Sequence, residues 1–154
     1  MNDFYKKKPY KTYTIDVNND KNLAKNLTKN INKDFPPNDK EKFNILYIYY
    51  LADQTFKYPN NSSNVLYIGN SVGELNNGKT NLGFRFKHCL DGHDSKQNIC
   101  LSNYYKKAYI IGLDVFDLSK TKQRAAEEEK KLRYKFLNQY GALPIADGAN
   151  YKKI

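Results

Sequence analysis

The chain has 154 residues, enough for one domain to bury a hydrophobic core without metal ions or disulfide bonds. Its 26 lysine and arginine residues and 16 aspartate and glutamate residues give a formal net charge of +10. Neither a transmembrane helix nor a secretory signal is expected, because no apolar run approaches about 18 residues and no apolar stretch follows the basic first residues.

The positive charge indicates the kind of partner. A protein this basic commonly binds a polyanion, since each lysine near a phosphate releases condensed counterions. We therefore expect nucleic acid as the partner. The alternative is a genome that enriches lysine, asparagine, tyrosine and isoleucine in all its proteins.

The two cysteines bear on the cell compartment. Cys89 and Cys100 lie eleven residues apart, and neither belongs to a CxxC motif. This spacing favours two free thiols in a reducing cytoplasm over a disulfide. With His88 and His93, the cysteines match no common zinc motif.

The first 40 residues are predicted to form a basic N-terminal arm and a helix, ahead of a second region at 41–154. Residues 1–16 are basic and aromatic without a clear period, which indicates an arm or an edge strand. Within 18–33 apolar residues recur at every fourth position, as on a helix with one narrow apolar stripe. The stripe either packs on the protein's own core or forms a dimer contact. Its residues are Leu23, Leu27 and Ile31.

The middle of the chain is predicted to contain two strands and a helix. The tyrosine-rich run 43–52 is predicted to be one strand, and 65–68 a second strand that pairs antiparallel with it. Residues 53–64 and 72–81 are rich in turn-forming residues and are predicted to be loops. Residues 82–90 are predicted to be helical.

The last third of the chain completes the predicted fold. Residues 98–107 are predicted to form a short helix, 108–116 a third strand, and 121–140 a long helix that Gly141 and Pro144 end. Together these elements predict an α/β or α+β fold. Its sheet would be small, three-stranded and largely antiparallel, with helices packed on it.

Tyrosines on the first two predicted strands are candidates for an active site. Tyr47 and Tyr49 share one face of the first strand, and Tyr67 and Gly69 share one face of the second. A suitable register therefore brings Tyr47 or Tyr49 beside Tyr67. The alternative is ordinary cross-strand aromatic packing. Gly69 indicates a close approach of the backbone or a tight turn.

Two predicted helices carry charged residues at informative positions. Arg85, Lys87 and His88 lie within four residues, and an arginine fork matches phosphate oxygens; the alternative is a solvated basic face. On the long helix, a rotation of about 100° per residue places Glu129 within the apolar stripe. A carboxylate there is costly unless it reaches solvent, pairs with a lysine or binds a cation. The stripe consists of Ala125, Leu132, Phe136 and Tyr140.

Taken in this order, the elements resemble the GIY-YIG nuclease family between residues 43 and 150. Tyr67-Ile68-Gly69 matches the second triplet of that family. Residues 48–53 resemble the run that contains the first triplet, with Tyr47 in place of the glycine. Tyr49 is then the motif tyrosine, or Tyr47 if the register is shifted. The other positions that fit are Arg85 for the helix arginine, Glu129 for the metal-binding glutamate, His88 beside Cys89 for a histidine beyond the arginine, and Asp147 or Asn150 for an asparagine near the C-terminus.

The resemblance implies a metal-dependent DNA endonuclease, a phosphodiester hydrolase of restriction or mobile-element type. Glu129 would bind one Mg²⁺ or Mn²⁺, and Arg85 would hold a nonbridging phosphate oxygen. Tyr49 or Tyr47 would orient or deprotonate the attacking water, and Tyr67 would position the water or the phosphate. The lysines expected to contact DNA are Lys6, Lys7, Lys8, Lys79 and Lys87.

Three further expectations follow from the same resemblance. A free tyrosine phenol titrates near pH 10, so it needs a neighbouring cation or the field of the metal, and Lys87 or His88 is expected to help. One site cuts one strand, so double-strand cleavage implies a homodimer or repeated action. The alternative to an enzyme is a catalytically inactive nucleic-acid-binding protein on the same scaffold, which the missing first glycine, Cys89 and Asp147 favour.

Overall fold

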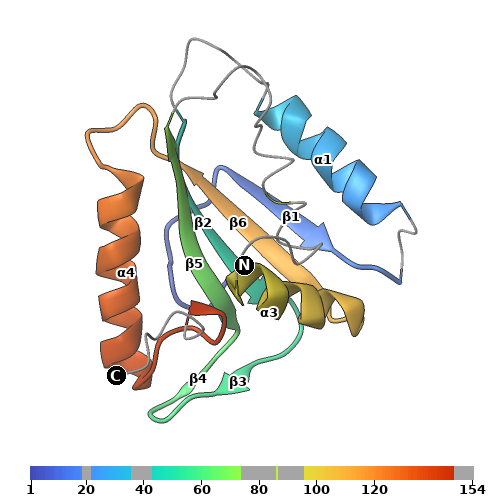
Figure 1. The fold of residues 1–154 in the computed structure, drawn as a ribbon. Helices are drawn as coiled ribbons and strands as arrows, with labels where there is room; N and C mark the ends of the chain where they lie inside the picture. Colours follow the sequence, from blue (N-terminus) through green and yellow to red (C-terminus); the bar gives the residue numbers. More distant parts are fainter. Residues whose placement is uncertain (19–21, 36–42, 74–85, 87–95, 148–154) are drawn as a thin grey trace.

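The computed structural model describes residues 1–18, 22–35, 43–73, 86 and 96–147. These residues form a four-stranded antiparallel sheet in the order β1-β6-β2-β5, a separate two-stranded sheet, and three helices (Figure 1). None of the helices in this part of the chain has the length and apolar character that a membrane span requires. The elements are β1 (Lys11–Ile15), α1 (Leu23–Asp34), β2 (Phe43–Leu51), β3 (Phe56–Lys57), β4 (Ser62–Ser63), β5 (Val65–Gly73), α3 (Lys96–Lys106), β6 (Ile111–Asp117) and α4 (Ala125–Tyr140).

The helices cover both faces of the four-stranded sheet, with α4 on one face and α1 and α3 on the other (Figure 1). Strand β2 explains this layering, because its alternating residues supply both cores. Leu46 and Ile48 pack in the core under α4, whereas Tyr47 and Tyr49 pack in the core under α1 and α3. A central strand that is buried on both faces reads as a nearly continuous apolar run, as this one does from Ile45 to Leu51.

The fold confirms the mixed α/β class and corrects the number of strands. The sheet has four strands rather than three, because β1 pairs with β6 along its whole length. Of the two alternatives for residues 1–16, the edge strand is therefore correct for Lys11–Ile15. The apolar stripe of α1 packs on the protein's own core, where Leu27 and Ile31 are buried.

Other boundaries also differ from the predicted ones. The predicted loop 53–64 contains the short strands β3 and β4, and β5 continues to Gly73. Residues 74–85 and 87–90, which include most of the predicted helix 82–90, lie outside the described residues. Phe86 is described and is fully buried against Tyr47 and other aromatic rings.

Helix α4 begins at Ala125 rather than at residue 121 because a side chain from β2 caps it there. The Oδ1 atom of Asn44 accepts a hydrogen bond from the Ala125 N–H at 2.7 Å. The Nδ2 atom of Asn44 donates to the carbonyl oxygens of Leu118 and Gln123. The first free N–H groups of a helix need such acceptors, and here the acceptor comes from the sheet. At the other end, Gly141 adopts the left-handed conformation that ends the helix, as predicted.

Residues 2–5 form a hook that is part of the core under α4. Its anchor is Asp114 of β6, a fully buried carboxylate. Asp114 accepts hydrogen bonds from the backbone N–H of Asn2 at 3.1 Å and from its Nδ2 atom at 2.8 Å. It also accepts from the hydroxyls of Thr12 and Tyr50. Four donors thus compensate for the lost hydration of a charge that has no cation beside it among these contacts.

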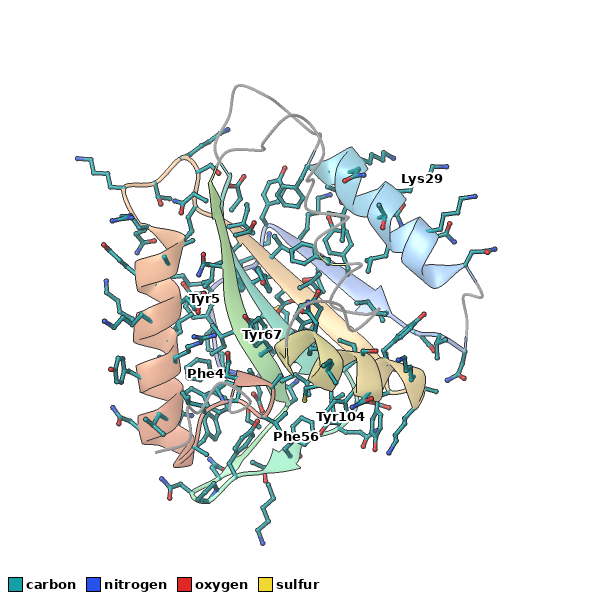
Figure 2. The ribbon with its side chains drawn as sticks, in the orientation of Figure 1. Phe4, Tyr5, Lys29, Phe56, Tyr67 and Tyr104 are labelled. Carbon is teal, nitrogen blue, oxygen red and sulfur yellow. The ribbon has the colours of Figure 1, made fainter. Side chains whose placement is uncertain are left out.

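The aromatic residues of the hook pack against α4 and β6 (Figure 2). The Phe4 ring lies 5.1 Å from that of Phe136, and the Tyr5 ring lies 4.9 Å from that of Phe116, both edge to face. The Oδ1 atom of Asn2 accepts the N–H groups of Phe4 and Tyr5, which turns the backbone so that both rings point into the core. The first residues are therefore built into the domain.

We expect Asn2→Ala to lower the free energy of unfolding by about 2–4 kcal/mol. The change removes one hydrogen bond to a buried carboxylate and the acceptor of two backbone N–H groups. Urea denaturation measures the difference. Lys8→Ala, at an exposed position next to the hook, is the control and should change stability by less than about 0.5 kcal/mol. Equal stability of the two variants would show that the hook is not an anchor.

Candidate active site at the edge of the sheet

The register of β2 and β5 brings the motif tyrosines together. Tyr49 pairs with Tyr67, and Tyr47 pairs with Gly69. The rings of Tyr47 and Tyr67 lie 6.0 Å apart, over Gly69. A Cβ atom at Gly69 would lie 2.5 Å from the Tyr67 ring and 2.7 Å from the Tyr47 ring. The predicted close approach at this glycine is therefore confirmed, and what approaches is a pair of tyrosine rings.

The two tyrosines of β2 are less accessible than Tyr67. Tyr49 is fully buried and Tyr47 is 3% exposed, and both rings contact Phe86. Tyr67 is partly exposed, on a strand at the edge of the sheet (Figure 2). Tyr67 is thus the tyrosine of this group that a large substrate can reach, and Tyr47 is the one whose ring joins it directly.

The outer edge of β5 is closed by polar groups from α4 and from the segment after it. An edge strand leaves N–H and C=O groups without strand partners. Here the Ile68 N–H donates to the Oδ2 atom of Asp147 at 3.1 Å, and the Ile68 carbonyl accepts from the guanidinium of Arg133 at 3.3 Å. Two residues earlier on β5, the carbonyl of Leu66 accepts a hydrogen bond from the Ala146 N–H at 2.9 Å.

Glu129 lies on the buried face of α4, as the helical spacing predicts, and is 9% exposed. Its Oε1 atom lies 3.0 Å from the Nη1 atom of Arg133, one turn further along the helix. Its Oε2 atom accepts a hydrogen bond from the Nδ2 atom of Asn70, the residue that follows Gly69 on β5. Each carboxylate oxygen therefore has a partner. One partner is an arginine, where the sequence suggested a lysine, and the other is the Asn70 amide.

Arg133 connects the groups at this edge. Besides Glu129 and Ile68, its guanidinium forms an ion pair with Asp147. The same guanidinium lies 5.8 Å from the centre of the Tyr67 ring, in cation–π geometry. We call Asn70, Glu129, Arg133 and Asp147 the edge cluster. Through Arg133, the edge cluster on the α4 side of the sheet contacts the tyrosines on the other side.

Burial dominates the electrostatics of the edge cluster. It raises the pKa of Asp147, which is 3% exposed, to about 7, with Glu129 adding to the rise and Arg133 and the Ile68 N–H opposing it. Burial alone would lower the pKa of Arg133, but Asp147 and Glu129 outweigh it and raise that pKa. The cluster therefore holds one permanent cation between two carboxyl groups, one of which changes charge near neutral pH.

The structure brings together only part of the predicted site. Tyr47, Tyr49, Tyr67 and Gly69 converge, and Glu129 and Asp147 meet through Arg133. Glu129 and the two tyrosines of β2 lie on opposite faces of the sheet, so the metal ligand and the water-activating tyrosine that the family resemblance implies do not face each other directly. The predicted DNA-contacting residues Lys6, Lys7 and Lys8 are exposed next to the hook. The predicted site residues outside the described part of the chain are Lys79, Arg85, Lys87, His88 and Asn150.

Two members of the edge cluster were not predicted from the sequence. Arg133 stands four residues after Glu129, a spacing at which opposite charges pair on a helix, and this signal could have found it. Asn70 follows Gly69 directly and points to the face opposite Tyr67, but nothing in the sequence shows that its partner is Glu129. The guanidinium that meets Glu129 in the described part of the chain is that of Arg133; Arg85, the predicted phosphate-binding arginine, lies outside the described residues.

The described residues do not build a metal site by themselves. Mg²⁺ and Mn²⁺ prefer carboxylate and other oxygen ligands, which Glu129 supplies. However, Arg133 and Asn70 already occupy its two oxygens. Among the described residues, no group of three or more histidine, cysteine, aspartate or glutamate side chains could hold a metal ion. A cation at Glu129 would have to share these oxygens with Arg133 and Asn70 and take its other ligands from elsewhere.

Comparison of the chain with protein-family models, curated proteins and solved structures finds no match. The function is therefore inferred from the residues and their geometry.

We expect Gly69→Ala to lower the free energy of unfolding by about 1–3 kcal/mol, because the new methyl group would overlap two tyrosine rings. In a background that carries Tyr47→Ala and Tyr67→Ala, the same change should cost less than about 0.5 kcal/mol. Chemical denaturation of the four proteins measures both costs. Equal costs in the two backgrounds would contradict the packing described for Gly69.

We expect the pH dependence of stability to identify Asp147. Its pKa is near 7 in the folded state and about 3.9 when unfolded, so the folded state binds more protons between these values. The free energy of unfolding should therefore fall as pH rises from about 4 to about 7. Asp147→Asn removes this titration. Between pH 5 and pH 8, the free energy of unfolding of the wild type should therefore fall by about 1–3 kcal/mol more than that of Asp147→Asn.

Urea denaturation at both pH values measures this difference. Asp53→Asn, at an exposed position, is the matched control and should keep the pH dependence of the wild type. Identical pH dependence of all three proteins would contradict the raised pKa of Asp147.

Proposed function

We propose that this protein is an endonuclease of the GIY-YIG type that hydrolyses phosphodiester bonds in DNA. The observation that carries the proposal is the contact between Arg133 and Tyr67, which links the buried Glu129 to the strand that bears the second triplet. A glutamate and a partly exposed tyrosine that contact the same arginine at the sheet edge are chemistry that a purely structural sheet edge does not need. The net charge of +10 fits a polyanionic substrate.

In the proposed reaction a water oxygen attacks phosphorus, and the bond from phosphorus to the leaving 3′ oxygen breaks. Tyr67 positions the water or the phosphate, because it is the most exposed of the three tyrosines. Tyr47 packs against Tyr67 and orients its ring, and Tyr49 supports both from the core. Arg133 holds Glu129 at the edge and places positive charge beside the phenol. Arg85 stays the proposed phosphate clamp on the ground of the sequence.

A dependence on Mg²⁺ or Mn²⁺ also stays a proposal from the sequence resemblance. Glu129 is the proposed ligand, although its two oxygens are engaged within the edge cluster. No step of the proposed reaction is assigned to the metal, and cleavage with and without a divalent cation decides whether one is required.

One observation favours a second candidate, a nucleic-acid-binding protein without catalytic activity. Each carboxylate oxygen of Glu129 already has one partner within the edge cluster, and Tyr47 and Tyr49 are buried. In this case the edge cluster would fasten α4 to β5 and would have no chemical role. Purified protein that binds DNA but never cuts it, with either divalent cation, would favour this candidate over the nuclease.

We expect Glu129→Gln to reduce cleavage of supercoiled plasmid about a hundredfold or more, because it removes a charge from the reacting site. DNA binding should change little. The free energy of unfolding should fall by about 1–3 kcal/mol, because Arg133 loses one of its two carboxylates and keeps Asp147, so cleavage is measured under conditions in which both proteins are folded. Glu127→Gln is the matched control, because it removes an exposed carboxylate two residues away on the same helix. The measurement is the rate of nicking with Mg²⁺ and the position of the ends. Wild-type rates in Glu129→Gln would end the assignment.

A further inference from the structure

The outer surface of α4 is basic and is not used by the edge cluster. Lys131 and Lys135 are exposed and one helical turn apart, on the side of α4 that faces away from β5. Lys130 and Tyr134 lie between them and Arg133 around the helix, as the rotation of about 100° per residue requires. Tyr134 is 60% exposed. Lysines interleaved with an exposed tyrosine are typical of nucleic-acid-binding surfaces.

The hook brings more lysines to the same surface. Lys6, Lys7 and Lys8 are exposed and follow the hook directly. The Nζ atom of Lys135 lies 5.5 Å from the centre of the Phe4 ring, and that of Lys7 lies 5.6 Å from the centre of the Tyr5 ring. Because Phe4 and Tyr5 are adjacent in the hook, lysines from both ends of the sequence converge. We call Lys6, Lys7, Lys8, Lys131 and Lys135 the basic ridge.

Two acidic residues of α4 lie near the ridge. Glu127 lies 3.6 Å from Arg124, and the side chains of both are largely exposed, at 62% and 72%. Exposed ion pairs of this kind contribute little to stability, so a phosphate can replace Glu127 without a large cost. Glu128 lies 4.0 Å from Lys131, its side chain is 13% exposed, and it offsets part of the charge of the ridge.

We propose that the basic ridge binds the sugar–phosphate backbone of duplex DNA. The helix is 16 residues long, or about 24 Å, and duplex DNA presents one negative charge per about 1.7 Å of its axis. A duplex along α4 therefore places several phosphates over the ridge. Lys130 and Tyr134 continue the surface toward Arg133, so a duplex bound there also reaches the edge cluster. The proposal shares its DNA partner with the proposed nuclease but does not depend on cleavage.

The test is the salt dependence of DNA binding without divalent cations. A fluorescein-labelled duplex of about 30 base pairs is titrated with the full chain in EDTA, between about 50 and 200 mM salt, and anisotropy is measured. For Lys131→Gln/Lys135→Gln the slope of log affinity against log salt should decrease in magnitude by about 1.8, which is about 0.9 per lost phosphate contact. Affinity at about 0.1 M salt should fall about ten- to hundredfold.

The matched control is Lys25→Gln/Lys29→Gln on α1, which removes the same charge from exposed positions on the opposite side of the sheet (Figure 2). It should bind almost as the wild type does. If both variants lose the same affinity, the loss reflects net charge alone and the proposed binding surface is wrong. The proposal is also wrong if Lys131→Gln/Lys135→Gln binds DNA as the wild type does. If the protein binds DNA through the ridge but does not cut plasmid, the proposed nuclease activity is contradicted, whereas the proposed DNA-binding surface is supported.

Discussion

One guanidinium, that of Arg133, decides how the second half of the chain is held together. It satisfies two carboxylates that are almost fully buried, Glu129 and Asp147, and one backbone carbonyl of an edge strand. Removing one partner of a buried ion pair typically costs several kcal/mol, since the other charge is left without compensation. Because these three groups come from α4, from β5 and from the segment after α4, their common cation fixes the helix relative to the strand. The position of Tyr67 then follows from the same contact.

A third buried carboxylate, Asp114, plays the corresponding part on β6, but by a different physical means. It is compensated by neutral donors, of which Asn2 supplies two. The two networks close opposite parts of the same core: Arg133 seals the side of α4 next to β5, and the hook seals the side next to β6. As a result, one side of the helix is fixed by the polar contacts of Arg133 and the other by the aromatic packing of Phe4, which the hydrogen bonds of Asn2 hold in place, and the outer surface of the helix is left for a partner. The lysines of that surface thus belong to a rigid element, which favours a defined geometry of binding.

Strands and helices whose apolar residues recur at a regular spacing are predicted well from the sequence. The contacts between these elements are predicted poorly. The apolar run of β2, the stripe of α4 and the shared face of Tyr47 and Tyr67 depend on local spacing, and the structure agrees with each. The edge cluster depends on hydrogen bonds between β5 and residues 129–147, which no local pattern encodes. The hook was also missed, because Phe4 and Tyr5 stand among lysines and have no period. The start of α4 at Ala125 depends on Asn44, some 80 residues away in the sequence.

The two edges of the sheet are both unsuited to joining another sheet. On β5 the outward groups of Leu66 and Ile68 are taken by Ala146, Arg133 and Asp147. On the opposite edge, β1 has five residues, and its Lys11 and Tyr13 contact Asp34 at the end of α1. Short, charged and tethered edge strands resist pairing between chains. If two copies cooperate to cut both strands of a duplex, these contacts on β1 and on the first half of β5 favour a meeting through helices, loops or the DNA itself over a continuous intermolecular sheet.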